Sequence, residues 1–233
     1  TREKDVEVLK EYAYKMLKNT GHEEISLSSL SSSDYSHLRE LVMFLIENFK
    51  SQGINISLPS LRIDAFSLDV MGQVQDIRKS SLTFAPEAGS QRMRNVINKG
   101  LTEEDILEGA GQAFEGGWNK VKLYFMLGLP TETEEDVKGI ALLSNEIAKL
   151  YYETGPKEKR NGKGQITAST SFFIPKPFTP FQWAPMCTKE QFLDKAHTVK
   201  TAVLEQLNKK SIKYNWHEAD VTLLEGLLAR QQA

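Results

Sequence analysis

Cysteine is nearly absent from this chain, because Cys187 is the single one among 233 residues. One thiol excludes an intrachain disulfide framework and any all-cysteine metal site within these residues, and it fits a reducing compartment. No apolar run approaches the roughly 20 residues that span a bilayer, and no signal peptide is visible. These features predict a soluble, cytoplasmic chain with no membrane partner.

An excess of charge of one sign is also lacking. The formal net charge is −2 and the pI is near 6.1, whereas proteins that bind nucleic acid usually carry an excess of positive charge. The net charge describes the whole chain and not a local patch. Nucleic acid is therefore not indicated. The four histidines, His22, His37, His197 and His217, have no metal-ligand spacing, so we expect no metal site within the chain.

Hydrophobic periodicity predicts helices that alternate with short strands. The expected helices cover residues 1–20, 38–49, 67–76, 102–114, 133–150, 188–207 and 219–230, and the expected strands cover residues 25–27, 54–58, 82–84, 121–127 and 166–174. Thr131 with Glu134 and Thr188 with Gln191 resemble capping boxes. Alternating elements favour parallel strands with right-handed crossovers, in one domain over residues 1–233.

One face of the predicted strands is polar. It carries Ser26, Ser28, Asn55, Ser57, Thr83, Lys122, Tyr124, Thr167, Ser169 and Ser171, whereas apolar residues alternate with them. Helices need the apolar face, so the polar face points elsewhere. We interpret this pattern as an open α/β barrel whose hollow holds a polar ligand; the alternative is a sheet with one face in water.

Two motifs mark strand ends, LTFAPEAGSQR over residues 82–92 and YFMLGLPTETEED over residues 124–136. Each strand breaks at Pro and Gly, offers carboxylate or hydroxyl groups, and passes quickly into a helix. Proteins of the α/β class bind their ligands at such strand ends. Both motifs therefore belong to the predicted binding site.

At these motifs the sequence resembles the radical S-adenosylmethionine (radical SAM) enzymes, in the branch of methylthiotransferase-like and elongator-like proteins. The resemblance extends to SLSSLSSSDY from residue 26, SLPSLRIDAF from residue 57, APEAGSQRMRNVINKG from residue 85 and FIPKPFTPFQW from residue 173. It covers nearly the whole chain. It implies a partial TIM-like (β/α)6 barrel of parallel strands, here strands two to six plus C-terminal helices, with the first strand missing.

Members of this family bind a 4Fe-4S cluster through a CxxxCxxC loop, and the cluster reductively cleaves S-adenosylmethionine to a 5′-deoxyadenosyl radical. The chain has no such loop. The resemblance thus implies two cofactors, S-adenosylmethionine and a cluster whose ligands lie outside these residues. We expect an inactive fragment of an enzyme with an unknown substrate, and an exposed strand edge that favours self-association.

The resemblance and the strand positions together select the residues expected to bind S-adenosylmethionine. Lys122 and Tyr124 lie on the polar face, Arg62 suits a carboxylate, and Glu87 suits ribose hydroxyls. Ser90 either joins Glu87 or caps a helix. The full set is Ser28, Ser29, Asp34, Arg62, Glu87, Ser90, Lys122, Tyr124, Gly128, Phe173, Ile174 and Pro175. No catalytic residue is assigned.

Two other functions remain open from the sequence. The first is a lyase or aldolase barrel in which burial lowers the pKa of Lys122, so that its amine forms a Schiff base. The second is a scaffold domain without catalysis. Phe178, Phe181 and Trp183, in the proline-rich segment after the last predicted strand, are expected to be packing aromatics.

Overall fold

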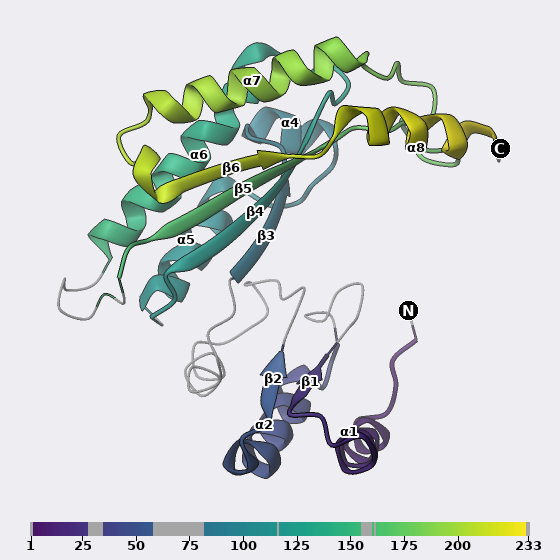
Figure 1. Cartoon of the computed structure of the whole chain (residues 1–233), viewed down its shortest axis with the longest axis vertical. Helices are drawn as coiled ribbons and strands as arrows, with labels where there is room; N and C mark the ends of the chain where they lie inside the picture. Colours follow the sequence, from purple (N-terminus) through teal and green to yellow (C-terminus); the bar gives the residue numbers. More distant parts are fainter. Residues whose placement is uncertain are drawn as a thin grey trace. The chain divides into compact units, whose positions relative to one another are not determined.

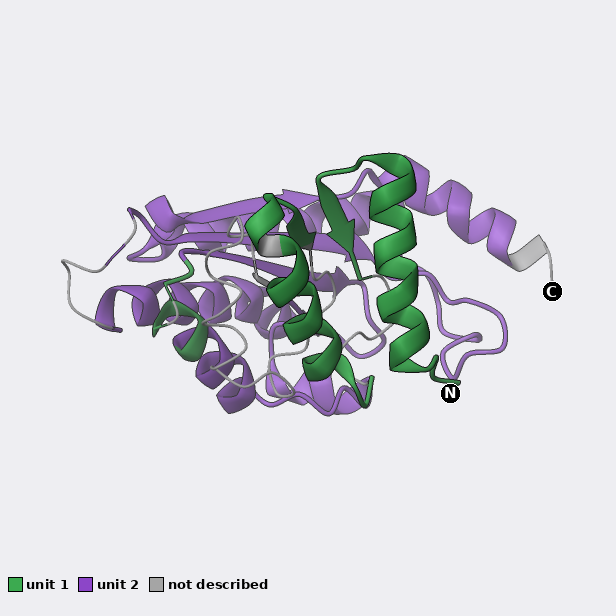
Figure 2. Ribbon diagram, turned by 90° about the horizontal axis from the view of Figure 1, so that it is seen from below, with its two compact units in different colours: residues 1–83, 112–118 green, residues 84–111, 119–233 purple. Residues whose placement is uncertain are grey.

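A computed structural model describes residues 2–27, 35–57, 82–115, 117–154, 160 and 162–231. The chain divides into two compact units (Figure 2), and each is described by itself. The first comprises Thr1–Thr83 with Gln112–Trp118, and the second comprises Phe84–Gly111 with Asn119–Ala233. The predicted helix at 67–76 lies outside the described residues.

The described residues of the first unit include helices α1 and α2 and a pair of parallel strands. Helix α1 (Val6–Thr20) begins at Asp5, whose carboxylate accepts from the amides of Glu7 and Val8, and it ends at the left-handed Gly21. Strand β1 (Glu24–Ser26) pairs in parallel with β2 (Asn55–Ser57). Helix α2 (Leu38–Phe49) and the short 3-10 helix η2 (Lys50–Gln52) connect these strands.

The second unit is built on a four-stranded sheet with the order β3-β4-β5-β6 (Figure 1). Its strands are β3 (Leu82–Glu87), β4 (Lys120–Leu127), β5 (Gln165–Phe172) and β6 (Ile212–Trp216). Strand β5 pairs in parallel with both β4 and β6. The predicted parallel α/β arrangement is therefore confirmed for these strands.

Helices cover one face of this sheet. The helices that follow β3 along the chain are α4 (Gln91–Val96), α5 (Glu103–Glu115), α6 (Glu134–Glu153), α7 (Lys189–Glu205), the 3-10 helix η5 (Lys209–Ser211) and α8 (Ala219–Gln231). Phe172 stacks on Phe192 of α7 with ring centroids 4.5 Å apart. Each such fully buried side chain contributes about 1.5–3 kcal/mol. No helix in the described part of the chain is long and apolar enough to cross a bilayer.

The opposite face of the sheet, called the open face below, carries the polar side chains that the sequence predicted. Lys122 and Tyr124 are exposed and Ser169 is half-buried, whereas the alternating Leu123 and Phe125 are fully buried. Alternation along β4 and β5 thus separates a helix-covered apolar face from a polar one, as expected. The ligand-lined hollow itself stays a prediction.

Three local features of the structure were not predicted correctly from the sequence. Strand β6 was not predicted, although Ile212, Tyr214 and Trp216 alternate with polar residues in the manner of a strand. Helix α4 is the helix that Ser90 was allowed to cap, but its bounds were not predicted, because six residues are too few to show a helical period. The capping box of α6 is formed by Thr133 and Asp136 and not by Thr131 and Glu134, whereas the box of Thr188 and Gln191 at α7 is confirmed.

Two of the three aromatics predicted to pack are exposed instead. Phe178 is 92% exposed and Trp183 is 89% exposed, whereas Phe181 lies against Phe173 with ring centroids 6.1 Å apart. Phe178 adopts a positive φ of 62°, which turns the backbone of the proline-rich segment sharply. The sequence shows only that the three side chains are apolar. Which ring faces inward depends on the backbone conformation of the turn.

A close crossing of two glycines fixes the turn after β3 against helix α6. A β-carbon at Gly89 would lie 2.3 Å from the amide nitrogen of Ile140 and 2.7 Å from the carbonyl oxygen of Asp136. A β-carbon at Gly139 would lie 3.0 Å from the carbonyl carbon of Gly89. Backbone therefore packs directly on backbone, which only glycine permits.

We predict that Gly89→Ala destabilises the protein by about 3 kcal/mol, because the added methyl group forces the strand-end turn away from α6. Urea unfolding monitored by circular dichroism measures the change. Gly111→Ala is the matched control: its β-carbon would meet the Leu150 side chain at 3.5 Å inside α5, so it is expected to be neutral or to stabilise by up to about 1 kcal/mol. Equal midpoints for the two variants would contradict the crossing.

Candidate functional site

The candidate site lies at the carboxyl ends of β3, β4 and β5, where α/β proteins bind ligands. Glu87 is the last residue of β3, Gly128 directly follows β4, and Phe173 directly follows β5. The amide of Phe173 donates to the Leu127 carbonyl over 2.8 Å, which holds two of these strand ends together. The structure thus places three segments of the predicted set at one edge of the sheet.

Glu87 occupies a strained backbone position. Its φ is 67°, in the left-handed region that a residue with a side chain adopts at a cost. Its carboxylate Oε1 lies 3.4 Å from the Lys99 ammonium, and both side chains are partly exposed. Glu87 is therefore a partly accessible carboxylate whose present partner is a partly exposed ammonium group.

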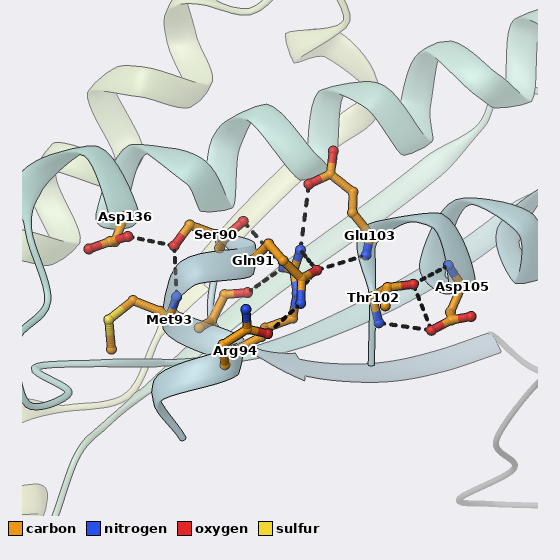
Figure 3. Close-up of polar contacts among 11 residues, drawn as sticks. Ser90, Gln91, Met93, Arg94, Thr102, Glu103, Asp105 and Asp136 are labelled. Atoms are coloured by element: carbon orange, nitrogen blue, oxygen red, sulfur yellow. Dashed lines mark hydrogen bonds and ion pairs between the residues drawn. The ribbon is translucent and has the colours of Figure 1, made fainter. Parts of the chain in front are cut away.

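Ser90 is a helix cap and a hydrogen-bond donor. Its Oγ accepts from the amide of Met93 over 3.2 Å at the start of α4, and it donates to Oδ1 of Asp136 over 2.5 Å (Figure 3). The capping role that the sequence allowed is confirmed. Because the hydroxyl proton points at Asp136, Ser90 offers a ligand no free donor in this arrangement.

Asp136 gathers four groups from two segments. Arg92 binds both of its carboxylate oxygens, and the amide and hydroxyl of Thr133 each donate to Oδ2 over 2.8 Å. The same Arg92 guanidinium donates to the Thr131 carbonyl over 2.8 Å. We call Ser90, Arg92, Thr133 and Asp136 the carboxylate latch. It ties the turn after β3 to the turn after β4.

The latch decides the charge of Asp136. Burial alone would raise the pKa of this carboxyl group, since only 5% of the residue is exposed. The hydrogen bonds from Arg92, Ser90 and Thr133 outweigh burial and hold the pKa of Asp136 well below its ordinary value. Asp136 is therefore ionised at neutral pH and serves as the anchor of the turn.

A second polar network fixes the segment between α4 and α5. The fully buried guanidinium of Arg94 donates to the Ala88 carbonyl over 3.0 Å and to Gln91 over 3.1 Å, and it lies 3.5 Å from Glu103 (Figure 3). Burial lowers the pKa of Arg94, and Glu103 opposes the shift. Thr102, the first residue of the helix predicted over residues 102–114, caps α5, because its Oγ1 accepts from the amide of Asp105.

The turn after β4 is closed by an ion pair between a buried carboxylate and a partly exposed lysine. Glu132 accepts from the Gly128 amide over 2.8 Å, and Lys195 of α7 lies 2.9 Å from the same oxygen. Burial raises the pKa of Glu132, and the bonds from Lys195 and Gly128 oppose the rise. Gly128, at φ 84°, is needed for packing: a β-carbon there would lie 2.7 Å from the Phe192 ring and 3.1 Å from Cys187.

Apolar side chains form a cluster beneath the strand ends. Phe173 packs with Ala88, Met93 and Leu129, and all four are buried. Pro175 is buried and Ile174 is half-buried. Phe173, one of the residues expected to line a ligand, therefore contributes mainly to the core that supports the turns.

Lys122 and Tyr124 lie apart from these turns, on the open face of β4. Lys122 precedes Gly128 by six residues, which corresponds to about 20 Å along a strand. Because Lys122 is exposed, the burial that a Schiff-base amine would require is not observed in the second unit. The remaining predicted residues, Ser28, Ser29, Asp34 and Arg62, lie outside the described residues.

Sequence reasoning missed Arg92, Asp136, Glu132 and Lys195. Asp136 had a local signal, since Thr133 and Asp136 have the spacing of a capping box. The contacts of Arg92 with Asp136 and of Lys195 with Glu132 join residues 44 and 63 positions apart, respectively, and nothing local indicates them. Within the described ranges no three His, Cys, Asp or Glu side chains are grouped to hold a metal ion.

Comparison with known proteins agrees with the resemblance. Residues 1–143 match the radical SAM superfamily. The chain is 34% identical over 208 residues to an uncharacterized protein of Methanocaldococcus jannaschii, a match that covers 89% of this chain and 41% of that protein. The chain thus spans less than half the length of this relative.

A solved structure shows the same fold. The archaeal Methanocaldococcus infernus Elp3 with an N-terminal deletion superposes with a TM-score of 0.51 and 12% sequence identity, over 98% of this chain and 59% of that one. At this identity the likeness concerns the fold alone. The predicted fold class, an α/β fold of the partial TIM-like barrel kind, is confirmed.

We predict that Asp136→Asn destabilises the protein by about 2 kcal/mol at pH 7, because Arg92 loses its buried counter-charge. The pKa of Asp136 is depressed in the folded state. Its contribution to the free energy of unfolding is therefore complete above the ordinary pKa of 3.8 and is lost as the pH falls below that value. The difference in the free energy of unfolding between wild type and variant should decrease below pH 3.8. Urea unfolding at several pH values measures it, with the exposed Glu134→Gln as control; a difference independent of pH would refute the latch.

Proposed function

Because the chain belongs to the radical SAM superfamily, we propose that it is part of the core of an enzyme that binds S-adenosylmethionine at the strand-end site. The intact enzyme would cleave this cofactor reductively at a 4Fe-4S cluster and start radical chemistry on a substrate that is still to be identified. The observation that carries the proposal is the family match over residues 1–143, together with the position of Glu87 and Gly128 at adjacent strand ends.

The residues of this chain do not fit the iron-sulfur cluster. Such a cluster is held by several cysteine thiolates, and the chain supplies only Cys187. Cys187 is half-buried beside Glu132 and Lys195, and burial raises the pKa of its thiol, which disfavours the thiolate that binds iron. We therefore propose that the cluster ligands lie in a segment outside these 233 residues.

The strand-end residues fit S-adenosylmethionine better. Ribose hydroxyls are donors, and Glu87 is a partly exposed acceptor at the end of β3. A bound ribose would replace the Lys99 ammonium as the partner of Glu87, which costs little because that ion pair is long, at 3.4 Å, and partly exposed to water. The carboxylate latch and the Phe173 cluster would hold the Glu87 turn in place before the ligand arrives.

The first test concerns the missing cluster ligands. We expect the reading frame that encodes these residues to contain a CxxxCxxC loop within about 20 residues before Thr1, a distance that suits one short connection and a helix start. The 233-residue chain should bind S-adenosylmethionine at least about 100-fold more weakly than the longer protein with its cluster reconstituted, as measured by calorimetry. It should also produce no 5′-deoxyadenosine under reducing conditions. Equally tight binding of S-adenosylmethionine by the 233-residue chain alone would contradict the proposal that binding requires a cluster held outside these residues.

The second test addresses Glu87 in the longer protein. Glu87→Ala should weaken S-adenosylmethionine binding by about tenfold or more, because a charge-assisted hydrogen bond to the ribose is lost. Lys99→Ala is the matched control, since it removes the other half of the same ion pair without removing a predicted ligand contact. Its affinity should equal or exceed that of the wild type. Equal losses in both variants would mean that the ion pair only supports the fold.

A further inference from the structure

Three lysines gather on the open face of the sheet, toward the amino ends of its strands. Lys120 and Lys122 belong to β4 and Lys213 belongs to β6, and all three are exposed. Pairing places Lys122 beside Thr167 of β5 and Thr167 beside Lys213, in one row across three strands. Lys120 is paired with Gln165 in the row below. We call these three lysines the basic row.

Strand geometry brings the three ammonium groups within reach of one small ligand. Neighbouring strands lie about 4.8 Å apart, so the Cα atoms of Lys122 and Lys213 are separated by about 10 Å. Lys120 and Lys122 are two residues apart on the same face, at about 7 Å. Lysine side chains are long and flexible enough to converge over the half-buried Thr167 that lies between them.

The charge of this face has no internal compensation in the part of the chain that the structure describes. None of the three lysines has a carboxylate within ion-pair distance there. Glu87, at the far end of β3, is already paired with Lys99. Three like charges therefore stand side by side in a chain whose net charge is −2. Such an arrangement is unfavourable until an anion neutralises it.

We propose that the basic row binds a phosphate group of a small molecule, with the lysines neutralising its charge and the Thr167 hydroxyl donating a hydrogen bond. A phosphate carries several acceptor oxygens, which suits donors that approach from two strands and from the hydroxyl between them. The site lies about 20 Å along the strand from the Gly128 turn, so it does not depend on the proposed radical chemistry. Lys120 and Lys213 have no part in the strand-end site.

Calorimetric titration of the 233-residue chain with inorganic pyrophosphate tests the proposal. Lys120→Gln/Lys213→Gln should weaken pyrophosphate binding by about tenfold or more, because two charge-assisted contacts are lost. Lys138→Gln/Lys149→Gln is the matched control, since it removes the same charge from helix α6, where each lysine is paired with a glutamate. The control should change affinity by less than about twofold.

A single Thr167→Val variant provides a second measurement that leaves the charge unchanged. It should weaken binding by about threefold or more, since one hydrogen bond is lost while all three lysines remain. Circular dichroism confirms that each variant is folded, and Lys213→Gln alone replaces the double variant if that one does not fold. Absence of pyrophosphate binding to the wild type at millimolar concentrations would overturn the proposal. Equal weakening by the basic-row and control variants would overturn it as well, because it would indicate nonspecific attraction.

Discussion

The buried carboxylate of Asp136 is the interaction on which the strand-end site depends. It receives Ser90 and Arg92 from the segment after β3 and Thr133 from the start of α6, so one anion joins two connections that are distant in sequence. A buried charge is tolerated only when it is paired and hydrogen-bonded, and here every contact comes from the segments that follow β3 and β4. Stability and site geometry are therefore set by the same group.

The sequence predicted the elements of this fold well where hydrophobic periodicity was long. Helix α6 and strands β4 and β5 have regular alternation, and their bounds agree closely with the expected ones. Helix α4 and strand β6 are short, so their periods are weak signals. The predicted strand-end residues Glu87 and Gly128 do lie on neighbouring strands, because parallel strands bring their carboxyl ends to one edge.

The roles of individual residues were harder to predict than their places. Ser90 is both a cap and a partner of Asp136, and Gly128 is required by the Phe192 ring, although both were expected to contact a ligand. Packing and long-range hydrogen bonds decide such roles, and they depend on which segments the fold brings together. A motif specifies a local turn, whereas the neighbour of that turn comes from elsewhere in the chain.

The two ends of the sheet are adapted to different chemistry. At the carboxyl ends, Glu87 and Thr131 both adopt positive φ angles. The hydrogen bonds of the carboxylate latch, which fixes their turns, are made within the protein. Strained non-glycine residues persist only where the surroundings over-determine them, which agrees with the preformed ribose site proposed at Glu87. Toward the amino ends, the lysines of the basic row have no carboxylate partner among the residues that the structure describes, which agrees with the anion proposed to bind there. One polar face thus presents two chemically distinct surfaces, and the strand register separates them.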